Sequence, residues 1–384
     1  MTGKERVIAA IKGEKTDRVP IWLGWEWYYH QPLPEADDFS RGWKQKPEYK
    51  RVFEYASQYA DTLHPCGTNL FNRFGVLPPY RIINDDGIHT DPDTISMQGY
   101  LDLPDRKLYF ENEARRGQAT TWNIKHPVHS LEDLDAILET AFEIDQSALE
   151  FGVKNLRSQY EKVGDRGLLR VSISSPMITI SNCMSMQSFL EACGAEEGYM
   201  HQALNEVTRR ILLIIDPLFT QLADMDILIN VGGSEQCVPP LMSPDMYDRL
   251  VIPYEKQIVD KLKRDYNFLC NCHCHGRVRH ALQSMMEIGF DCTDPVEPPP
   301  MGDVTFEEAR RIVGDKMTLI GNIEFEELEF LKPCQITERI KEILSGGSHR
   351  VIIGTSGGPI TEVSKNLEAN YFALIDAALK YGGN

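Results

Sequence analysis

The sequence lacks long apolar runs and has no excess of basic residues. No stretch of about 18 or more apolar residues occurs, so no membrane-spanning helix is expected. Lys and Arg total 40 against 57 Asp and Glu, which gives the 384-residue chain a formal net charge of −17. Because nucleic-acid binding needs clustered Lys and Arg to contact phosphates, this balance argues against a nucleic-acid partner.

Disulfides and export are not indicated either. The nine cysteines are an odd number, and scattered thiols of this kind are typical of a reduced, cytoplasmic protein. The first residues lead into an amphipathic pattern and lack the apolar run of a signal peptide. A chain of this length can bury a large core without disulfides or metal. We therefore expect a cytoplasmic protein.

From about residue 130 onward, apolar strands alternate with amphipathic helices. Strands are predicted at 168–174, 226–231, 267–275, 291–296, 317–320 and 350–353, and helices at 130–143, 186–193, 197–224, 244–264, 277–288, 336–344 and 363–380. This alternation implies a parallel sheet with helices outside it. A strand-like run at 19–30 precedes these units. Since no Gly-rich dinucleotide-binding turn follows this first strand, seven or eight strands favour a closed (β/α)8 barrel over an open sheet.

The N-terminal third of the chain departs from this alternation of strands and helices. A first helix is predicted, with Thr2 and Glu5 as a capping box and Gly13 at its end. Residues 80–125 are rich in Asp, Gly and Thr and predict an inserted antiparallel hairpin. No linker divides the chain, so residues 1–384 are expected to form one α/β domain, a single barrel with this insertion. A homodimer is the default expectation for such a barrel.

Polar residues at the C-terminal ends of barrel strands are the candidates for an active site. They are Glu235, His273, His275, Glu297, Asn322, Glu324 and Ser356. Along the strand at 267–275, Asn271, His273 and His275 share one face, which we expect inside the barrel, while three cysteines share the other. Two histidines at i and i+2 can form half of a metal site that carboxylates complete. A pair of histidines that binds substrate without metal is the alternative.

Other features have both functional and structural interpretations. Carboxylates such as Glu235 and Glu297 at strand ends are more often functional than structural. The aromatic residues between 22 and 29, which include Trp25 and Trp27, fit either a pocket for a flat substrate or ordinary packing. The glycines at 357 and 358 fit an anion site or, more simply, a tight turn.

With these motifs in place, the chain resembles the uroporphyrinogen decarboxylase superfamily over nearly its whole length. The segments that carry the resemblance are 4–14 with 17–20, 239–244 with 253–254, 273–276, 289–291, 295–300, 321–323 and 354–359 with Asn366. The resemblance implies an enzyme with its site at the mouth of a barrel. Two branches of the superfamily are relevant, and they catalyse different reactions.

True uroporphyrinogen decarboxylases carry an Arg-bearing Gln-Ala-Gly-Arg motif that binds substrate propionates. Here that place reads Trp25-Glu-Trp-Tyr-Tyr-His30 and contains no arginine. The decarboxylases' Phe-Ser-Asp-Ile segment is also missing, because the region reads Thr62-Leu-His-Pro-Cys-Gly67. Without a cationic clamp the chain lacks the means to hold a porphyrinogen with several carboxylates.

The second branch is similar to zinc methyltransferases that work with corrinoid proteins. Their His-x-Cys-Gly motif reads His273-Cys-His-Gly276 here, which puts His275 at the first thiolate, and Ser356 takes the place of the later Cys. A zinc site of Glu235, His273 and His275 would suit an oxygen leaving group better than a thiol. In this interpretation Glu297 orients or protonates the leaving group.

The resemblance thus implies a corrinoid-dependent methyltransferase that demethylates a small methylated donor, such as a methoxylated aromatic. Trp25, Trp27, Asn322 and Ser356 are the expected substrate contacts, and Glu235, His275 and Glu297 the expected catalytic groups. The corrinoid would be supplied by a separate carrier protein. The alternatives are a decarboxylase or lyase acting on a small carboxylate, and a binding protein without turnover.

Overall fold

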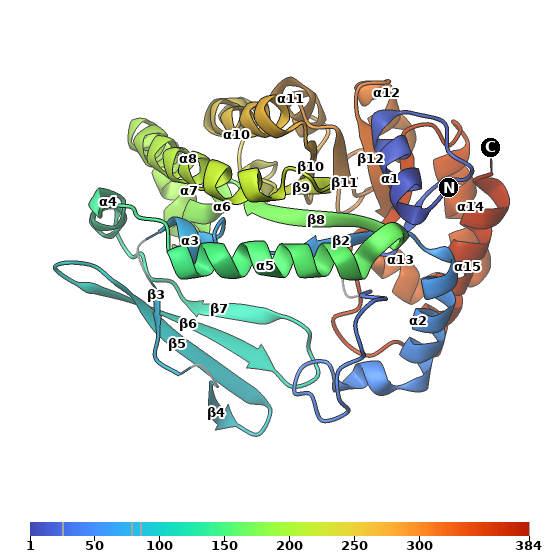
Figure 1. Cartoon of the computed structure of the whole chain (residues 1–384), viewed down its shortest axis with the longest axis horizontal. Coiled ribbons are helices and arrows are strands. Elements are labelled where there is room, and N and C mark those ends of the chain that lie inside the picture. The colour runs from blue at the N-terminus through green and yellow to red at the C-terminus, as the bar shows by residue number, and fades with distance from the viewer. Residues whose placement is uncertain (25–26, 78–79, 85–86, 384) are drawn as a thin grey trace.

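Eight parallel strands form the central sheet of the computed structural model, which describes residues 1–24, 27–77, 80–84 and 87–383 (Figure 1). In spatial order they are β1 (Ile21–Trp22), β13 (Val351–Thr355), β12 (Thr318–Ile323), β11 (Cys292–Pro295), β10 (Leu269–Cys274), β9 (Ile227–Gly232), β8 (Gly167–Ser174) and β2 (Thr62–Cys66). The amide of Asp61, just before β2, donates to the carbonyl oxygen of Ile21 in β1. The two outer strands therefore approach each other, and the sheet is a nearly closed (β/α)8 barrel, as predicted.

Helices surround this barrel. The longer ones are α2 (Pro47–Tyr59), α5 (Gln146–Val163), α7 (Met186–Ala195), α8 (Glu197–Phe219), α10 (Ile252–Tyr266), α14 (Pro333–Leu344) and α15 (Lys365–Tyr381). The shorter ones are α3 (Arg73–Val76), α4 (Leu131–Glu139), α6 (Pro176–Ser181), α9 (Pro244–Leu250), α11 (Ala281–Ile288), α12 (Phe306–Val313) and α13 (Phe325–Phe330). No helix in the described ranges combines the length and apolarity needed to cross a bilayer.

The helix at 244–264 was predicted to be continuous, and the structure corrects this. Two helices, α9 and α10, meet at Val251, and Pro253 lies in the first turn of the second. Proline has no backbone N–H to donate to the preceding turn, so the hydrogen-bond ladder is interrupted there. The predicted cap residue Ser243 does accept a hydrogen bond from the amide of Met246.

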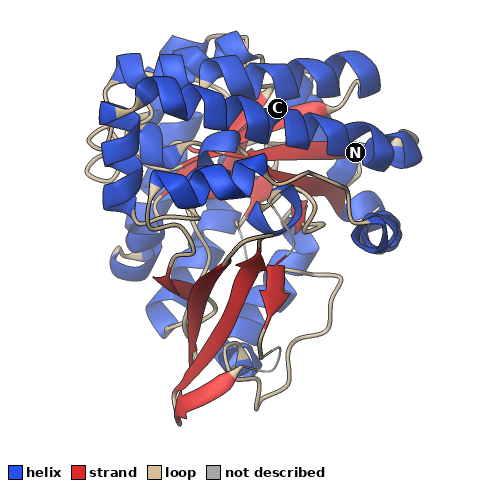
Figure 2. Cartoon of the chain, turned by 90° about the vertical axis from the view of Figure 1, so that its left-hand side faces the viewer, coloured by secondary structure: helices blue, strands red, loops and turns tan. Residues whose placement is uncertain are grey.

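The insertion is larger than the single hairpin that was predicted. Its strands are β3 (Tyr80–Ile82), β4 (Ile88–Asp91), β5 (Thr94–Asp102), β6 (Lys107–Arg115) and β7 (Thr121–Lys125), and they form an antiparallel sheet. A two-stranded hairpin is only marginally stable in water, and here further strands pair with both sides of its central β5–β6 ribbon. Figure 2 shows this sheet projecting from the barrel.

The barrel interior begins with an apolar layer at the N-terminal ends of the strands. Its buried members are Trp22, Leu63, Leu168, Leu228, Cys292, Ile320 and Ile352, joined by Val7, Ala10 and Ile11 of α1 (Gly3–Lys12). Thr2 and Glu5 form the predicted capping box of this helix, and Gly13 ends it with a left-handed backbone. Helix α1 therefore closes one end of the barrel and leaves the opposite mouth for the polar residues.

Candidate active site

A layer of buried polar side chains lies above the apolar layer. Arg170 of β8 and Asn271 of β10 both donate to Oδ1 of Asp294, at 2.7 and 2.6 Å. The Asn271 amide also donates to Asn230 of β9 at 2.8 Å. Burial alone would raise the pKa of Asp294, but the Arg170 charge and the hydrogen bonds from His273 and Asn271 outweigh it and hold that pKa well below its usual range. Asp294 is therefore ionised and fixed at the centre of the barrel.

His273 takes its orientation from Asp294. Its Nδ1 atom lies 2.8 Å from Oδ2 of this carboxylate, on the neighbouring strand and in register with it. Because an ionised carboxylate can only accept, Nδ1 carries the proton and the lone pair of a neutral ring is on Nε2. The predicted alternation along β10 is confirmed, since Cys270, Cys272 and Cys274 pack in the core outside the barrel.

His275 is held in the same way by Glu297. The Nδ1 atom of His275 lies 2.8 Å from Oε1 of Glu297, and the Gly276 amide donates to Oε2 at 2.6 Å. Burial opposes the charge on this ring, but the Glu297 carboxylate prevails and raises the pKa of His275. Burial would raise the pKa of Glu297, and the hydrogen bond from His275 lowers it overall. Both oxygens of Glu297 are thus occupied, and the group is an ionised carboxylate.

Glu235 reaches the two histidines from the turn after β9. The Gly233 amide donates to the carbonyl oxygen of His273, and Ser234 donates to the buried Glu255 at 2.7 Å, which fixes this turn. Ligand atoms of Glu235, His273 and His275 all lie within 4.8 Å of one another. Two imidazoles and a carboxylate, with each imidazole held by a second carboxylate, match the donor set and outer hydrogen bonds of zinc sites. The side chains therefore fit a bound metal ion.

Two further polar groups lie at the ends of β12 and β13. The Ser356 hydroxyl accepts from the Phe325 amide at 2.9 Å, and Glu324 caps the start of α13. Burial raises the pKa of Glu324, and the Glu297 charge adds to this rise against a hydrogen bond with Ser356. Oε2 of Glu324 and the amide nitrogen of the buried Asn322 have no hydrogen-bond partner among the described residues.

The described aromatic residues between 22 and 29 do not lie together in one pocket. Trp27 is 4 % exposed and stacks on Tyr49 in the core with ring centroids 4.7 Å apart, so it does not line the barrel mouth. Trp25 lies outside the described residues. Trp22 belongs to the apolar layer of the barrel. Asp294 was not among the predicted site residues, although it lies at the end of the strand next to the histidines and in register with His273.

Comparisons with known proteins agree with this fold. Residues 115–380 match the family model described as uroporphyrinogen decarboxylase (URO-D). A relative named methylcobamide:CoM methyltransferase MtaA, from Methanosarcina barkeri, is 23 % identical over 251 residues, which cover 65 % of this chain and 69 % of that protein. A uroporphyrinogen decarboxylase from Picosynechococcus sp. is 21 % identical over 382 residues, which cover 94 % of this chain and 97 % of that protein.

A solved structure has the same fold. It is a methyltransferase from Methanosarcina mazei, with a TM-score of 0.59, 18 % sequence identity and 99 % of both chains covered.

Proposed function

Because the chain belongs to the uroporphyrinogen decarboxylase (URO-D) family and one of its relatives is named a methylcobamide:CoM methyltransferase, we propose that it is a corrinoid-dependent methyltransferase. It would move a methyl group from a small methoxyaromatic donor to a corrinoid carried by a separate protein. The observation that carries this proposal is the Glu235–His273–His275 group, in which each histidine is braced by a carboxylate. The absence of the decarboxylases' arginine motif supports it.

Glu235, His273 and His275 would hold zinc in this scheme. Bound zinc supplies a Lewis acid that draws charge off the departing oxygen. Asp294 and Glu297 keep the two imidazoles oriented and Nε2 available as the ligand atom. A carboxylate with two imidazoles is a harder donor set than two thiolates, which suits an oxygen leaving group.

Glu324 is better placed than Glu297 to donate a proton to that oxygen. Glu297 was expected to orient or protonate the leaving group. Because it is ionised and both of its oxygens are engaged, we assign it instead to orienting His275. Glu324 has a raised pKa, one oxygen that caps α13 and one without a partner in the described structure. General acid catalysis requires a protonated carboxyl group with an oxygen that is free of other hydrogen bonds and can donate its proton to the substrate. We assign the buried Asn322 amide to contact the donor, and Ser356 to fix the start of α13.

Metal analysis of the purified chain tests this proposal. Mass spectrometry should find about one zinc per chain, as in a single catalytic site. The His273→Ala/His275→Ala variant should lose this zinc, whereas a His349→Ala control, altered at an exposed histidine paired with Asp315, should keep it. With a reduced corrinoid carrier, the zinc-loaded protein should methylate the corrinoid at the expense of a methoxyarene. Native protein without metal, or no methyl transfer from a broad panel of methoxyarenes, would contradict the proposal.

The near full-length match to a uroporphyrinogen decarboxylase favours a second candidate, a decarboxylase or lyase for a small carboxylate. Arg170 lies below the mouth, and it is fully buried and engaged by Asp294, so it does not replace the missing arginine clamp. This candidate predicts release of carbon dioxide from a carboxylate panel without any corrinoid. The two candidates are therefore distinguished by their products.

A further inference from the structure

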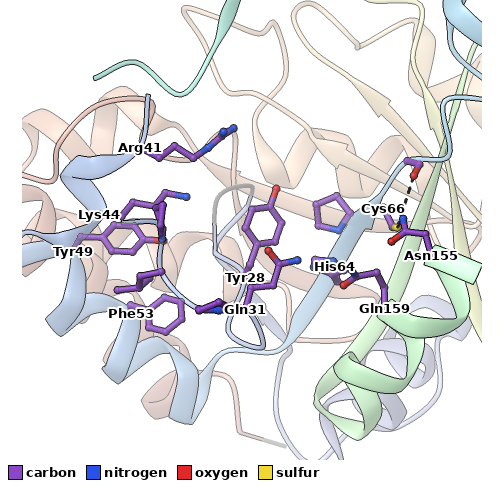
Figure 3. Close-up of a pocket in the computed structure, with 15 residues that line it drawn as sticks. Tyr28, Gln31, Arg41, Lys44, Tyr49, Phe53, His64, Cys66, Asn155 and Gln159 are labelled. Atoms are coloured by element: carbon purple, nitrogen blue, oxygen red, sulfur yellow. Dashed lines mark hydrogen bonds between the residues drawn. The ribbon is translucent and has the colours of Figure 1, made fainter. Parts of the chain in front are cut away.

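A cavity lies on the outer side of β2, away from the histidine site. Its volume is about 440 Å3, within the range of small-molecule sites. It is bounded by β2, by α2 and α5, and by residues 28–34 of the loop after β1 (Figure 3). Because it shares none of its described lining residues with the Glu235–His273–His275 group, it is a second candidate binding site.

Side chains alternate along β2, and this alternation puts the cavity outside the barrel wall. Leu63 belongs to the apolar layer of the barrel interior, so the next side chain, His64, points outward to the surrounding helices. Cys66 lies on the same outer side, where Nδ2 of Asn155 in α5 donates to its sulfur at 3.4 Å. The barrel wall therefore separates this cavity from the barrel interior.

His64 is a buried polar group whose hydrogen-bonding capacity the described protein does not use. It is 3 % exposed, and neither of its ring nitrogens has a hydrogen bond to a residue that the structure describes. Burial, with a smaller effect of His30, lowers the pKa of His64 to about 3. The ring is therefore uncharged at neutral pH and carries one N–H donor and one acceptor nitrogen. Buried polar atoms without a partner are rare, so His64 points to a bound molecule that can donate or accept a hydrogen bond.

Three uncharged carboxamides also line the cavity, those of Gln31, Asn155 and Gln159. Nδ2 of Asn155 donates to a thiol, and Oε1 of Gln159 lies 3.2 Å from a histidine nitrogen, but the other polar atom of each group has no hydrogen bond to a described residue. The Gln31 carboxamide has none to any described residue. In the view of Figure 3, Asn155 and Gln159 lie on the same side of the cavity as His64. A carboxamide offers a donor beside an acceptor, the pattern that pairs with the edge of a nucleobase.

Aromatic rings supply the flat walls of the cavity. Tyr28, Tyr49 and Phe53 line it, and the rings of Tyr49 and Phe53 are stacked with centroids 6.1 Å apart. Aromatic walls favour a flat ligand, because stacked rings bury a large area and attract each other beyond that burial. The cavity therefore combines a surface for a flat ring with uncharged groups that can contact a polar edge.

We propose that this cavity binds a purine-like base, a flat and uncharged nitrogen heterocycle with donors and acceptors along its edge. Its ring packs against the aromatic wall, and its edge contacts His64 and the carboxamides of Gln31, Asn155 and Gln159. Such an edge presents both a donor and an acceptor, so it satisfies either tautomer of a neutral imidazole. The site is separate from the proposed methyl-transfer centre and does not depend on that function.

Calorimetric titration with adenine tests the site. Gly67 lines the cavity, and a Cβ added there meets no atom within 4 Å, so Gly67→Leu places a side chain in the cavity without a clash at the backbone. The matched control is Gly198→Leu, at an exposed position on α8 where an added Cβ also meets nothing. We expect one adenine per chain in the native protein and in the control, and no measurable binding in Gly67→Leu.

Recognition of the polar edge is tested by a change in the protein and by a change in the ligand. Gln31→Leu should weaken adenine binding about 5-fold, the size of one neutral hydrogen bond, whereas Gln187→Leu, at an exposed glutamine of α7, should not change it. Indole has a similar flat outline but one N–H and no acceptor on its edge, so it should bind at least about 5-fold more weakly than adenine.

Binding of adenine should persist in His273→Ala/His275→Ala, because the barrel wall separates the cavity from those histidines. The proposal is overturned if adenine does not bind, if Gly67→Leu binds it normally, or if the double histidine variant loses it. It is also overturned if Gln31→Leu binds adenine as tightly as its control, or if indole binds as tightly as adenine.

Discussion

For each of the two histidines at the barrel mouth, a single carboxylate determines which ring nitrogen is available to bind a metal ion. Asp294 and Glu297 each contact Nδ1 of one ring, at 2.8 Å in both cases. The two imidazoles lie perpendicular, with centroids 4.7 Å apart. The orientation of the two imidazoles therefore depends on Asp294 and Glu297, which would not bind the metal themselves. Replacing a single one of these residues tests that dependence.

Replacing Glu297 by Gln should weaken zinc binding about 10- to 100-fold, the usual effect of losing an orienting partner. A glutamine oxygen can still accept from the Gly276 amide, so the local backbone should be kept. Competition with a chromophoric chelator measures the affinity. Glu307→Gln, at an exposed glutamate, is the control that should leave it unchanged. Unaltered zinc affinity in Glu297→Gln would show that His275 does not need this carboxylate.

Replacing Arg170 by Met should destabilise the protein by about 3–5 kcal/mol, because the buried Asp294 would lose its counter-charge. Urea unfolding followed by circular dichroism measures the change. The double variant Arg170→Met/Asp294→Asn removes both charges and should recover part of the loss. Equal stabilities of the single variant and the native protein would contradict the assigned pairing.

The proposed acid predicts a pH dependence of methyl transfer. A raised pKa means that Glu324 keeps its proton to higher pH than an ordinary glutamate does. The active form is the protonated one, so the rate of methyl transfer should fall as pH rises through this pKa. Glu324→Gln should remove that decline and lower the rate by about 10²- to 10⁴-fold. A rate profile that Glu324→Gln leaves unchanged would assign the proton to another group.

At the scale of elements, the turn after β9 determines where Glu235 lies. A Cβ added at Gly233 would lie 2.1 Å from the carbonyl oxygen of His273, so only glycine fits between β9 and β10 at this point. The close approach lets the Gly233 amide donate to that oxygen. The turn is thereby tied to the strand that carries both histidines.

Gly233→Ala should therefore displace Glu235 and abolish stoichiometric zinc binding, with a loss of stability of about 1–3 kcal/mol. Metal analysis and urea unfolding measure the two effects. Gly232→Ala is the matched control, because a Cβ there lies 3.6 Å from its nearest neighbour, an ordinary contact. Full zinc occupancy in Gly233→Ala would show that this turn does not position Glu235.

At the scale of the whole molecule, the alternation after residue 130 predicted most of the barrel correctly. Buried parallel strands are apolar runs. Helix caps, such as the capping box of Thr305 and Glu308 at the start of α12, are also visible in the sequence. Strand β2 was missed because His64 and Pro65 interrupt its apolar pattern. The candidate residues could be named, but their pairing with Asp294 and Glu297 depends on register between strands, which sequence patterns do not specify.

Metal removal should lower the stability of the whole barrel. A ligand that binds only the folded state stabilises it by about 2.7 kcal/mol at a free concentration of 100 Kd. Chelation should therefore reduce the midpoint of thermal unfolding, and added zinc should restore it. The His273→Ala/His275→Ala variant should show the same midpoint with and without chelator. A native midpoint that does not respond to chelator would mean that zinc is not bound in the folded state.

Helix α1 has a consequence for the order of events in the proposed reaction. Because Val7, Ala10 and Ile11 seal one end of the barrel, the described residues leave the opposite mouth as the entrance to its interior. In the proposed reaction the methyl donor and the corrinoid carrier would both approach through this mouth, and a bound carrier would cover a donor that had bound before it. The proposed reaction therefore predicts that the donor binds before the carrier and that the demethylated product leaves after it. The helix that closes one end of the barrel thus predicts an ordered binding mechanism at the other end.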